Sequence, residues 1–347
     1  MQFRKNILSL SPYKPPLSNR VDSGMHLLDF NERSCPLSSE ILEKLAAWCL
    51  AGVSHIYPDY SGLFEKISDY TKVLEKNIFI GNGSDQIIDC IMRAILNKGD
   101  KIIIPKPSFA MFEQLASLEE AEIINYDLLA DDPFTEIENL LQLKPRLIVF
   151  CQPNNPTGRM LDIQKIDELI KKYRDTWFFI DEAYFEYSCV SQLDITKDYE
   201  NLIVSRTFSK AFGLAALRLG YMVSSEKMVE QCLKIRGPYD INQFACFAGQ
   251  VVLDHVEEIQ DYSKKVMRQH KEKIETALRD KDIDFLPSEA NFLCVQNELA
   301  LAEFLSENGI RVRKMSQPEL NNSFRMTIGD EEITKLVLKL LADYKKG

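Results

Sequence analysis

The sequence has little of what marks membrane-spanning, metal-binding or nucleic-acid-binding proteins. No apolar run approaches the roughly 18–20 residues that a helix needs to span a bilayer. The chain has only four histidines in 347 residues, with no H-x-x-x-H pattern and no carboxylate cluster, so we expect no metal site. A net charge of −10 leaves no basic excess for nucleic acid or an anionic membrane surface, so neither is an expected partner.

A secretion signal and paired cysteines are also missing. The N-terminus has two early basic residues but neither an apolar h-region nor a small-residue cleavage site. The eight cysteines are scattered without any C-x-x-C, and most lie in apolar contexts that are typical of reduced core thiols. We therefore expect a cytoplasmic protein.

The middle of the chain alternates short apolar runs with amphipathic segments. With 45% hydrophobic and 27% charged residues, the chain is long enough for two globular domains. We expect strands at residues 77–80, 101–104, 121–126, 146–150, 177–180, 201–204 and 219–223. This alternation predicts an α/β fold, in which helices cover both faces of a mostly parallel sheet.

The pattern changes after residue 250. A long charged helix is expected from about Val251 to Leu278, followed by mixed helices and strands that indicate a smaller α+β domain. The predicted organisation is an N-terminal segment that packs on the small domain, a large domain and a C-terminal small domain, at residues 1–30, 31–250 and 251–347.

The stretch from Ser205 to Arg218 places a lysine in an unusual setting. Lys210 follows hydroxyl residues and precedes small apolar ones, whereas surface lysines usually have polar neighbours. A partly dry pocket favours the neutral amine, which can form a Schiff base with an aldehyde. Thr207, Ser209 and Arg218 would then be donors for a phosphate on the same molecule, which describes pyridoxal phosphate. Taken alone, a buried helix start with a snorkelling lysine explains this stretch equally well.

Ligands of parallel sheets bind beyond the carboxyl ends of the strands, so the residues after each strand are candidates. After the strand at 77–80, two glycines and a helix start at Ser84 and Asp85 offer backbone N–H groups to an anion. A glycine-capped turn without a ligand is the alternative, and a dinucleotide-binding turn would need glycine where Gln86 stands. Phe109, after the second strand, could stack on a flat heterocycle or pack in the core.

Two further strand ends carry polar side chains. Asn155 lies in a rigid turn between prolines and could donate its amide N–H to an oxygen on a ring. Asp181 ends a buried aromatic strand and needs a partner such as a protonated pyridine nitrogen, while Tyr184 could reach the phenolic oxygen of that ring. Together with Lys210, five strand ends offer groups that pyridoxal phosphate uses at once.

With these residues assembled, the chain resembles the fold-type I pyridoxal-phosphate aminotransferases, and more narrowly the histidinol-phosphate aminotransferase family. The resemblance runs from about residue 26 to the C-terminus. The segments that carry it are YPD at 57–59, GNGSD at 81–85, PNNPTG at 153–158, IDEAY at 180–184, SKAFGLAALRLGY at 209–221, PYDIN at 238–242, EANF at 289–292 and RMTIG at 325–329.

The resemblance implies a role for each candidate residue. Lys210 would carry the cofactor and move the substrate proton, Asp181 would pair with the ring nitrogen, and Asn155 and Tyr184 would bond the ring oxygen. Residues that would hold the phosphate are Ser84, Asp85, Thr207, Ser209 and Arg218. Tyr57 would reach the cofactor of the other subunit, which implies a homodimer with shared active sites.

The implied substrate contacts are Arg325 for the α-carboxylate, Arg313 for a distal phosphate, and the segment around Tyr13. Arg313 is equally well explained as an exposed arginine at a strand end. The chain departs from the family pattern mostly near the substrate, at Arg33 to Pro36, at Pro15 and Pro16, at Phe109 and at Asp330, and also at Gln86.

The expected activity is transfer of an amino group between glutamate and a small, phosphorylated keto substrate, in ping-pong steps. Decarboxylation of a phosphorylated amino acid, such as phosphoserine or phosphothreonine, is the alternative because related enzymes use nearly the same residues for it. A cofactor-sensing regulatory domain is a third hypothesis, which the absence of any DNA-binding module disfavours.

Overall fold

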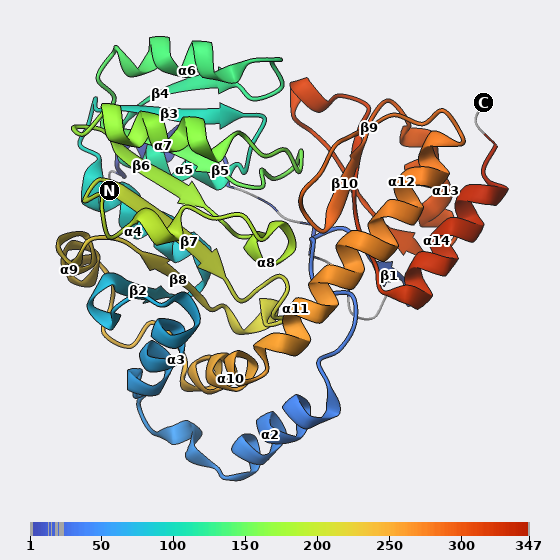
Figure 1. Ribbon diagram of the computed structural model, residues 1–347, viewed down its shortest axis with the longest axis horizontal. Helices are drawn as coiled ribbons and strands as arrows, with labels where there is room; N and C mark the ends of the chain where they lie inside the picture. Colours follow the sequence, from blue (N-terminus) through green and yellow to red (C-terminus); the bar gives the residue numbers. More distant parts are fainter. Residues whose placement is uncertain (1–2, 13, 15, 18–19, 21–23, 346–347) are drawn as a thin grey trace.

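The computed structural model describes residues 3–12, 14, 16–17, 20 and 24–345. Its main element is a seven-stranded sheet with the order β2-β8-β7-β6-β5-β3-β4 (Figure 1). The strands are β2 (Ile78–Gly81), β3 (Lys101–Lys106), β4 (Glu122–Asp127), β5 (Leu147–Cys151), β6 (Trp177–Asp181), β7 (Leu202–Thr207) and β8 (Gly220–Val223). Only β8 runs antiparallel to its neighbours in this sheet, so the predicted α/β fold with a mostly parallel sheet is confirmed.

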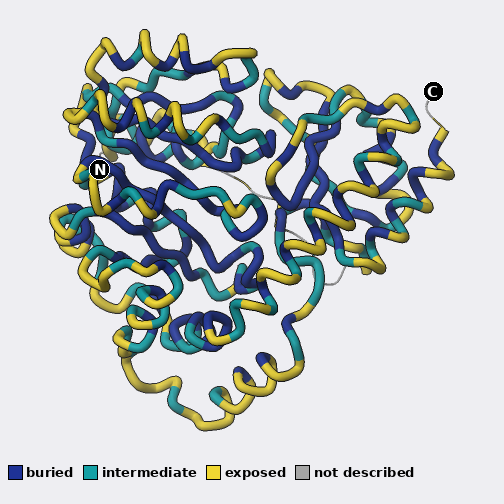
Figure 2. Tube along the Cα trace, in the orientation of Figure 1, coloured by how far each residue is buried: buried dark blue, intermediate teal, exposed yellow. Residues whose placement is uncertain are grey.

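Successive residues of the strands face two separate cores. In β6, Phe178 and Ile180 point into one core and Phe179 into the other, as the period of two in a strand requires. Figure 2 shows these strands as the most buried part of the chain. Because both faces are covered, the strands are apolar throughout rather than alternating.

Helices on each face supply the other half of each core. The core that contains Phe179 is closed by α4 (Gly83–Ile95), α5 (Met111–Leu118) and α9 (Glu226–Ile235). The core that contains Phe178 is closed by α3 (Ser61–Thr71), α6 (Pro133–Leu141), α7 (Ile163–Lys172) and α10 (Gln243–Asp254). Shorter or peripheral helices are α1 (Lys5–Leu8), α2 (Ser39–Leu50), α8 (Phe185–Ser188), η1 (Val53–His55), η2 (Glu75–Asn77), η3 (Leu193–Ile195) and η4 (Ala215–Leu217).

β3 is longer than predicted, because it continues through Pro105 to Lys106. A proline lacks the N–H group of a sheet ladder and is tolerated where a strand is paired on one side only. Pro105 is opposite Tyr126 of β4, whereas the pairing with β5 covers Ile102 and Ile103. Lys106 is thereby carried to the carboxyl edge of the sheet.

The small domain, in orange and red in Figure 1, contains an antiparallel sheet with the order β12-β13-β10-β9. Its elements are β9 (Phe285–Leu286), β10 (Phe292–Val295), α13 (Leu299–Glu307), β11 (Ile310–Arg311), β12 (Arg313–Lys314), η6 (Pro318–Leu320), β13 (Phe324–Thr327) and α14 (Glu331–Asp343). The strand β1 (His26–Leu27) pairs with β11 in parallel. Nearer the N-terminus, Arg4 and Asn6 instead donate to the Leu118 carbonyl at the end of α5, and the domain boundaries stay a prediction.

The single helix expected from Val251 to Leu278 is wrong in its first part, because the helical run begins at Val256 and then continues to Arg279. The segment is divided at His255 between α10 and α11 (Val256–Lys265), and a π-helix at Val266–Lys271 leads into α12 (Glu272–Arg279). The parts pack on different elements, since α10 lies against α3 and α11 lies against α8. Among the described residues, no helix is long and apolar enough to cross a membrane.

Gly249 of α10 offers a test of this packing. A Cβ atom on Gly249 would lie 2.6 Å from Cδ2 of Leu219 and 2.9 Å from Cδ1 of Leu63. We expect Gly249→Ala to lower the free energy of unfolding by about 1–3 kcal/mol, although alanine is the better helix former. Urea denaturation measures this change.

Gly62 of α3 is the matched control. A Cβ atom there would meet the flexible end of the Gln250 side chain, which can move away. Gly62→Ala should therefore leave stability unchanged or raise it slightly. Equal stability of the two variants would contradict the close packing of α10.

Candidate active site

A cavity of about 920 Å³ lies between the carboxyl edge of the large sheet and the small domain. The predicted site residues that line it are Ser84, Asp85, Phe109, Asn155, Asp181, Tyr184, Thr207, Ser209, Lys210, Arg218, Arg313 and Arg325. Tyr57 is 73% exposed and stacks on Tyr239, with ring centroids 4.3 Å apart, outside this cavity. Tyr13 lies outside the described residues.

One end of the cavity is built to hold an anion. The first turn of α4 brings Ser84 and Asp85 to its wall, where backbone N–H groups at a helix start favour negative charge. Arg218 completes this end, donating to Ser209 Oγ at 3.3 Å and pairing with Asp85 Oδ2 at 3.1 Å. Thr207 Oγ1 accepts the backbone N–H of Ser209 at 3.1 Å, which fixes the turn before Lys210.

Two glycines allow these donors to converge. A Cβ atom on Gly83 would lie 2.4 Å from Arg218 Nη2, and one on Gly220 would lie 3.0 Å from the Ser84 nitrogen. Arg218 itself has a left-handed backbone, with φ of 57°, which is uncommon outside glycine and often marks functional sites. The close approach leaves a compact cluster of donors that matches a phosphate group.

Asp181 lies further along the cavity, at the end of β6, with 4% of its surface exposed. Ser205 Oγ and the Ala183 N–H both donate to its Oδ1, at 3.1 Å and 3.2 Å. Burial nevertheless raises the pKa of Asp181 to about 7. Among the described residues no cationic side chain pairs with Asp181, and a protonated pyridine nitrogen would be a suitable partner.

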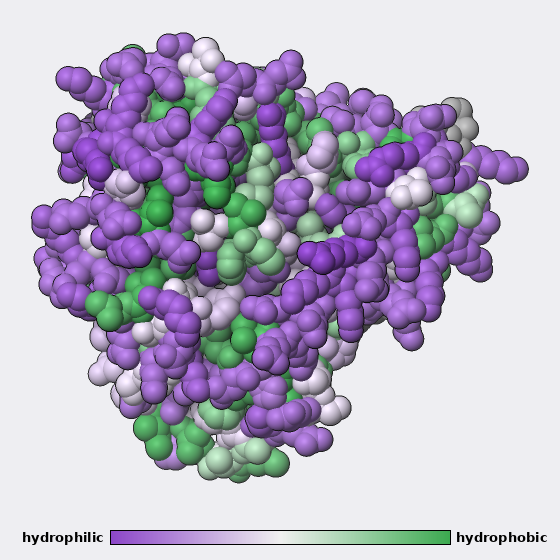
Figure 3. All heavy atoms as spheres, viewed as in Figure 1, coloured by the Kyte–Doolittle hydropathy of each residue, from purple (hydrophilic) through white to green (hydrophobic). Residues whose placement is uncertain are grey.

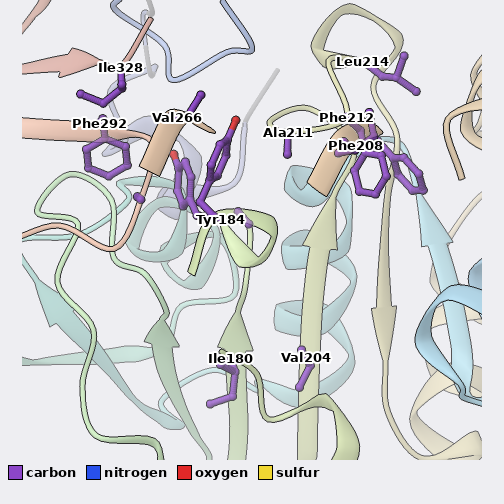
Figure 4. Packing of buried hydrophobic residues seen from close by; sticks show 14 of the residues in the cluster. Ile180, Tyr184, Val204, Phe208, Ala211, Phe212, Leu214, Val266, Phe292 and Ile328 are labelled. Carbon is purple, nitrogen blue, oxygen red and sulfur yellow. The ribbon is translucent and has the colours of Figure 1, made fainter. Parts of the chain in front are cut away.

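Tyr184 and Asn31 meet beside Asp181. Asn31 Nδ2 donates to the Tyr184 hydroxyl at 2.9 Å, and both side chains are buried. Figure 4 shows Tyr184 beyond Ile180 of β6, close to Phe292 of the small domain; the two rings meet edge to face, 5.2 Å apart. Tyr184 therefore joins the two domains at the cavity.

Lys210 points into the same space and donates to the Phe30 carbonyl at 2.8 Å. Burial of the amine, helped by the positive charge of Arg325, lowers the pKa of Lys210 to about 8. A substantial fraction of the amine is thus neutral and nucleophilic near physiological pH. This is the state that Schiff-base chemistry requires.

Two arginines face the cavity from the small domain. Arg325 on β13 donates to Asn155 Oδ1 and, at 2.8 Å, to the Asp29 carbonyl. Arg313 is directly opposite Arg325 in the pairing of β12 with β13. Asn155 and Arg325, expected to bind cofactor and substrate, therefore contact each other in this structure.

Some residues of the site were not assigned a role from the sequence. Ser205 lies in the Lys210 stretch and Glu182 follows Asp181. The sequence does not show that Ser205 bonds Asp181 or that Glu182 pairs with Arg206 on the neighbouring strand. Arg206 and Glu182 form a buried ion pair at 3.0 Å, with side chains 5% and 1% exposed. This pair ties β7 to β6 next to Thr207 and Asp181. Asn31 and the Phe30 carbonyl join the site only because the N-terminal segment folds across it.

The residues present fit pyridoxal phosphate, since the anion end, the buried Asp181 carboxyl and the Lys210 amine with its lowered pKa match its phosphate, ring nitrogen and aldehyde. A family model described as "Aminotransferase class I and II" matches residues 28–340. The chain belongs to that family. It is a fold-type I aminotransferase that depends on pyridoxal phosphate, and its cavity is the candidate active site.

Individual similar proteins have more specific names than the family model. A histidinol-phosphate aminotransferase of Ruminiclostridium cellulolyticum is 35% identical over 348 residues, covering 97% of this chain and 96% of that protein. A dihydroxyacetone phosphate transaminase of Campylobacter jejuni is 32% identical over 362 residues, covering 100% and 98%. The solved histidinol-phosphate aminotransferase of Sinorhizobium meliloti, in complex with pyridoxal-5'-phosphate, shares the fold, with a TM-score of 0.85, 21% identity and coverage of 99% and 98%.

By these comparisons, the protein is an aminotransferase that resembles the histidinol-phosphate aminotransferases. The roles of individual residues remain predictions. Among the described residues, no group of three or more His, Cys, Asp and Glu side chains is placed to hold a metal ion.

The lowered pKa of Lys210 leads to a titration test on the cofactor-free aminotransferase. We expect its amine to be half protonated near pH 8, well below the ordinary value of 10.5. Replacing Arg325 with methionine should raise the pKa, because a neighbouring positive charge disfavours the ammonium form. The pH dependence of Lys210 methylation measures the midpoint, with Lys210→Ala identifying its signal. A midpoint near 10.5 would show that the cavity does not desolvate the Lys210 amine.

Proposed function

We propose that this aminotransferase moves an amino group between glutamate and a small phosphorylated keto substrate, in two successive half-reactions. The observation that carries the proposal is the pair Arg313 and Arg325, opposite each other on β12 and β13 and lining the cavity that holds Lys210. Two adjacent guanidinium groups suit a substrate with two anionic ends, such as a carboxylate and a phosphate. The names of two relatives, which act on histidinol phosphate and dihydroxyacetone phosphate, support the phosphorylated partner.

Each side chain has a task in this reaction. Bound pyridoxal phosphate supplies an aldehyde and a ring that accepts electrons from the substrate. Asp181 would stay ionised against the ring nitrogen, and Asn155 and Tyr184 would orient the ring through its oxygen. Lys210, with a pKa of about 8 in the cofactor-free protein, would take the proton from the substrate α-carbon and return it to the carbon that comes from the cofactor aldehyde, two bonds away.

Arg325 is held ready for the α-carboxylate. Two of its partners, Asn155 Oδ1 and the Asp29 carbonyl, are uncharged acceptors. A carboxylate forms stronger, charge-assisted hydrogen bonds with a guanidinium group and would replace them. The backbone turn at Asn31, with φ of 56°, brings the Asp29 and Phe30 carbonyls to Arg325 and Lys210.

We also propose that the enzyme is a homodimer with shared active sites. Exposed apolar side chains gather around α2 and the segment after it, where Leu50, Ile56 and Tyr57 are 88%, 53% and 73% exposed. Figure 3 shows hydrophobic atoms at the end of the molecule where Figure 1 places α2. A second copy would cover this surface and receive Tyr57 at its anion site. The cytoplasmic location expected from the sequence stays a prediction.

Absorbance spectroscopy tests the transfer of the amino group. Adding glutamate to the cofactor-loaded enzyme should convert the pyridoxal spectrum to that of the pyridoxamine form, and a keto acceptor should reverse it. Lys210→Ala should lower the rate by at least about 10³-fold, because the group that moves the proton is lost. Unchanged turnover in this variant would overturn the mechanism.

Carbon dioxide release separates transamination from the alternative. If phosphoserine or phosphothreonine yields carbon dioxide while glutamate leaves the spectrum unchanged, the protein is a decarboxylase. We expect conversion with glutamate and no carbon dioxide.

Mixed dimers test the sharing of sites. Tyr57→Ala and Lys210→Ala subunits should each be impaired alone. A hybrid of the two should regain one intact site, with Lys210 from one subunit and Tyr57 from the other. We expect hybrids to regain up to about a quarter to a half of wild-type activity, depending on the fraction of mixed dimers. Activity equal to the average of the separate variants would contradict shared sites.

A further inference from the structure

The mouth of the cavity has one wall from each domain. The large domain contributes the end of β3 and the turn after it, from Lys106 to Ala110. The small domain contributes residues 313–319, which run from β12 into η6. An ion pair joins the two walls, with Lys106 Nζ 3.6 Å from Glu319 Oε1.

The ion pair between Lys106 and Glu319 is weak enough for another anion to replace Glu319. Its side chains are 44% and 29% exposed, and pairs in such a position contribute roughly 0–1 kcal/mol to stability. An anion with two charges attracts an ammonium group more strongly than one carboxylate does at the same distance. Glu319 is therefore a weak partner that a phosphate can displace from Lys106.

The other cations at the mouth differ from Lys106 in their surroundings. Lys314 is held by Glu303 at 2.9 Å, away from the pair between the walls. Arg313 lies over the Phe30 ring, 5.8 Å from its centroid, on the small-domain side. Among the described residues that line this cavity, Lys106 is the cation that the large-domain wall brings to the mouth, and it shares the cavity with Arg313.

We propose that Lys106 determines specificity for phosphorylated substrates: it releases Glu319 and binds the substrate phosphate together with Arg313. The inference rests on the proposed transamination and adds a residue that the sequence patterns did not single out. Glu319 acts in the opposite sense, because it competes with the phosphate for Lys106. Replacing Lys106 and replacing Glu319 are therefore expected to shift the affinity for phosphorylated substrates in opposite directions.

The test compares phosphorylated amines with their unphosphorylated counterparts on the cofactor-loaded enzyme. The probes are O-phospho-L-serine against L-serine, and L-histidinol phosphate against L-histidinol, followed by the cofactor spectrum. We expect Lys106→Gln to raise the half-saturating concentration of the phosphorylated amines about tenfold and to leave the maximal rate within about twofold. The unphosphorylated amines should be unaffected.

Glu319→Gln should lower the half-saturating concentration of the phosphorylated amines by about two- to fivefold, because the competing carboxylate is gone. Lys314→Gln is the matched control at the same mouth and should change it by less than about twofold. An equal effect of Lys106→Gln on both members of each pair would overturn the inference. So would a loss of affinity in Glu319→Gln.

Binding of inorganic phosphate separates this inference from the proposed function. Calorimetry on the cofactor-loaded enzyme should show weaker phosphate binding in Lys106→Gln and tighter binding in Glu319→Gln. This result would support the phosphate site even if no amine altered the cofactor spectrum. An unaltered spectrum would count against transamination but not against the phosphate site. Identical phosphate binding in wild type and both variants would overturn the role of Lys106, whatever the activity.

Discussion

Asp181 is held at the end of a strand that is buried on both faces, and burial raises its pKa to about 7. Keeping a carboxyl group there costs free energy unless a cation meets it. Among the described residues, no lysine or arginine pairs with it: the hydrogen-bond donors to Oδ1 are a serine hydroxyl and a backbone N–H. A pyridinium nitrogen beside Asp181 would meet this constraint, and the same cavity contains the anion end and the Lys210 amine that would hold the phosphate and the aldehyde of such a cofactor.

The same removal from water acts on Lys210 with the opposite result for its charge. Burial lowers the pKa of the amine to about 8, so desolvation pushes the acid and the amine toward their neutral forms in the cofactor-free protein. A pyridinium nitrogen would restore the charge of Asp181, whereas Lys210 is required neutral to react. One physical effect therefore prepares both groups, and the buried pair Glu182 and Arg206 keeps the strand ends that carry them in register.

The substrate side of the cavity depends on segments far apart in the chain. The turn at Asn31 contacts Arg325, Lys210 and Tyr184 through successive residues 29–31. The strand pairing of β12 with β13 sets Arg313 beside Arg325, and η6 brings Glu319 to Lys106. We therefore expect substrate choice to depend on the region where the small domain and the N-terminal segment meet the large sheet.

The α/β class, the cofactor and most of the residues that line the cavity follow from local patterns in the sequence. Strand ends are local features, and in a parallel sheet they meet at one edge, so the pattern alone groups Ser84, Asn155, Asp181 and Lys210. The break at His255, the pair Glu182 and Arg206, and the contacts of Asn31 arise only from tertiary packing. They depend on which distant surface each segment packs against, and neither periodicity nor local propensity carries that information. Lys106 is an example: nothing in its sequence neighbourhood sets it apart, and only the tertiary structure places it at the cavity mouth next to Glu319.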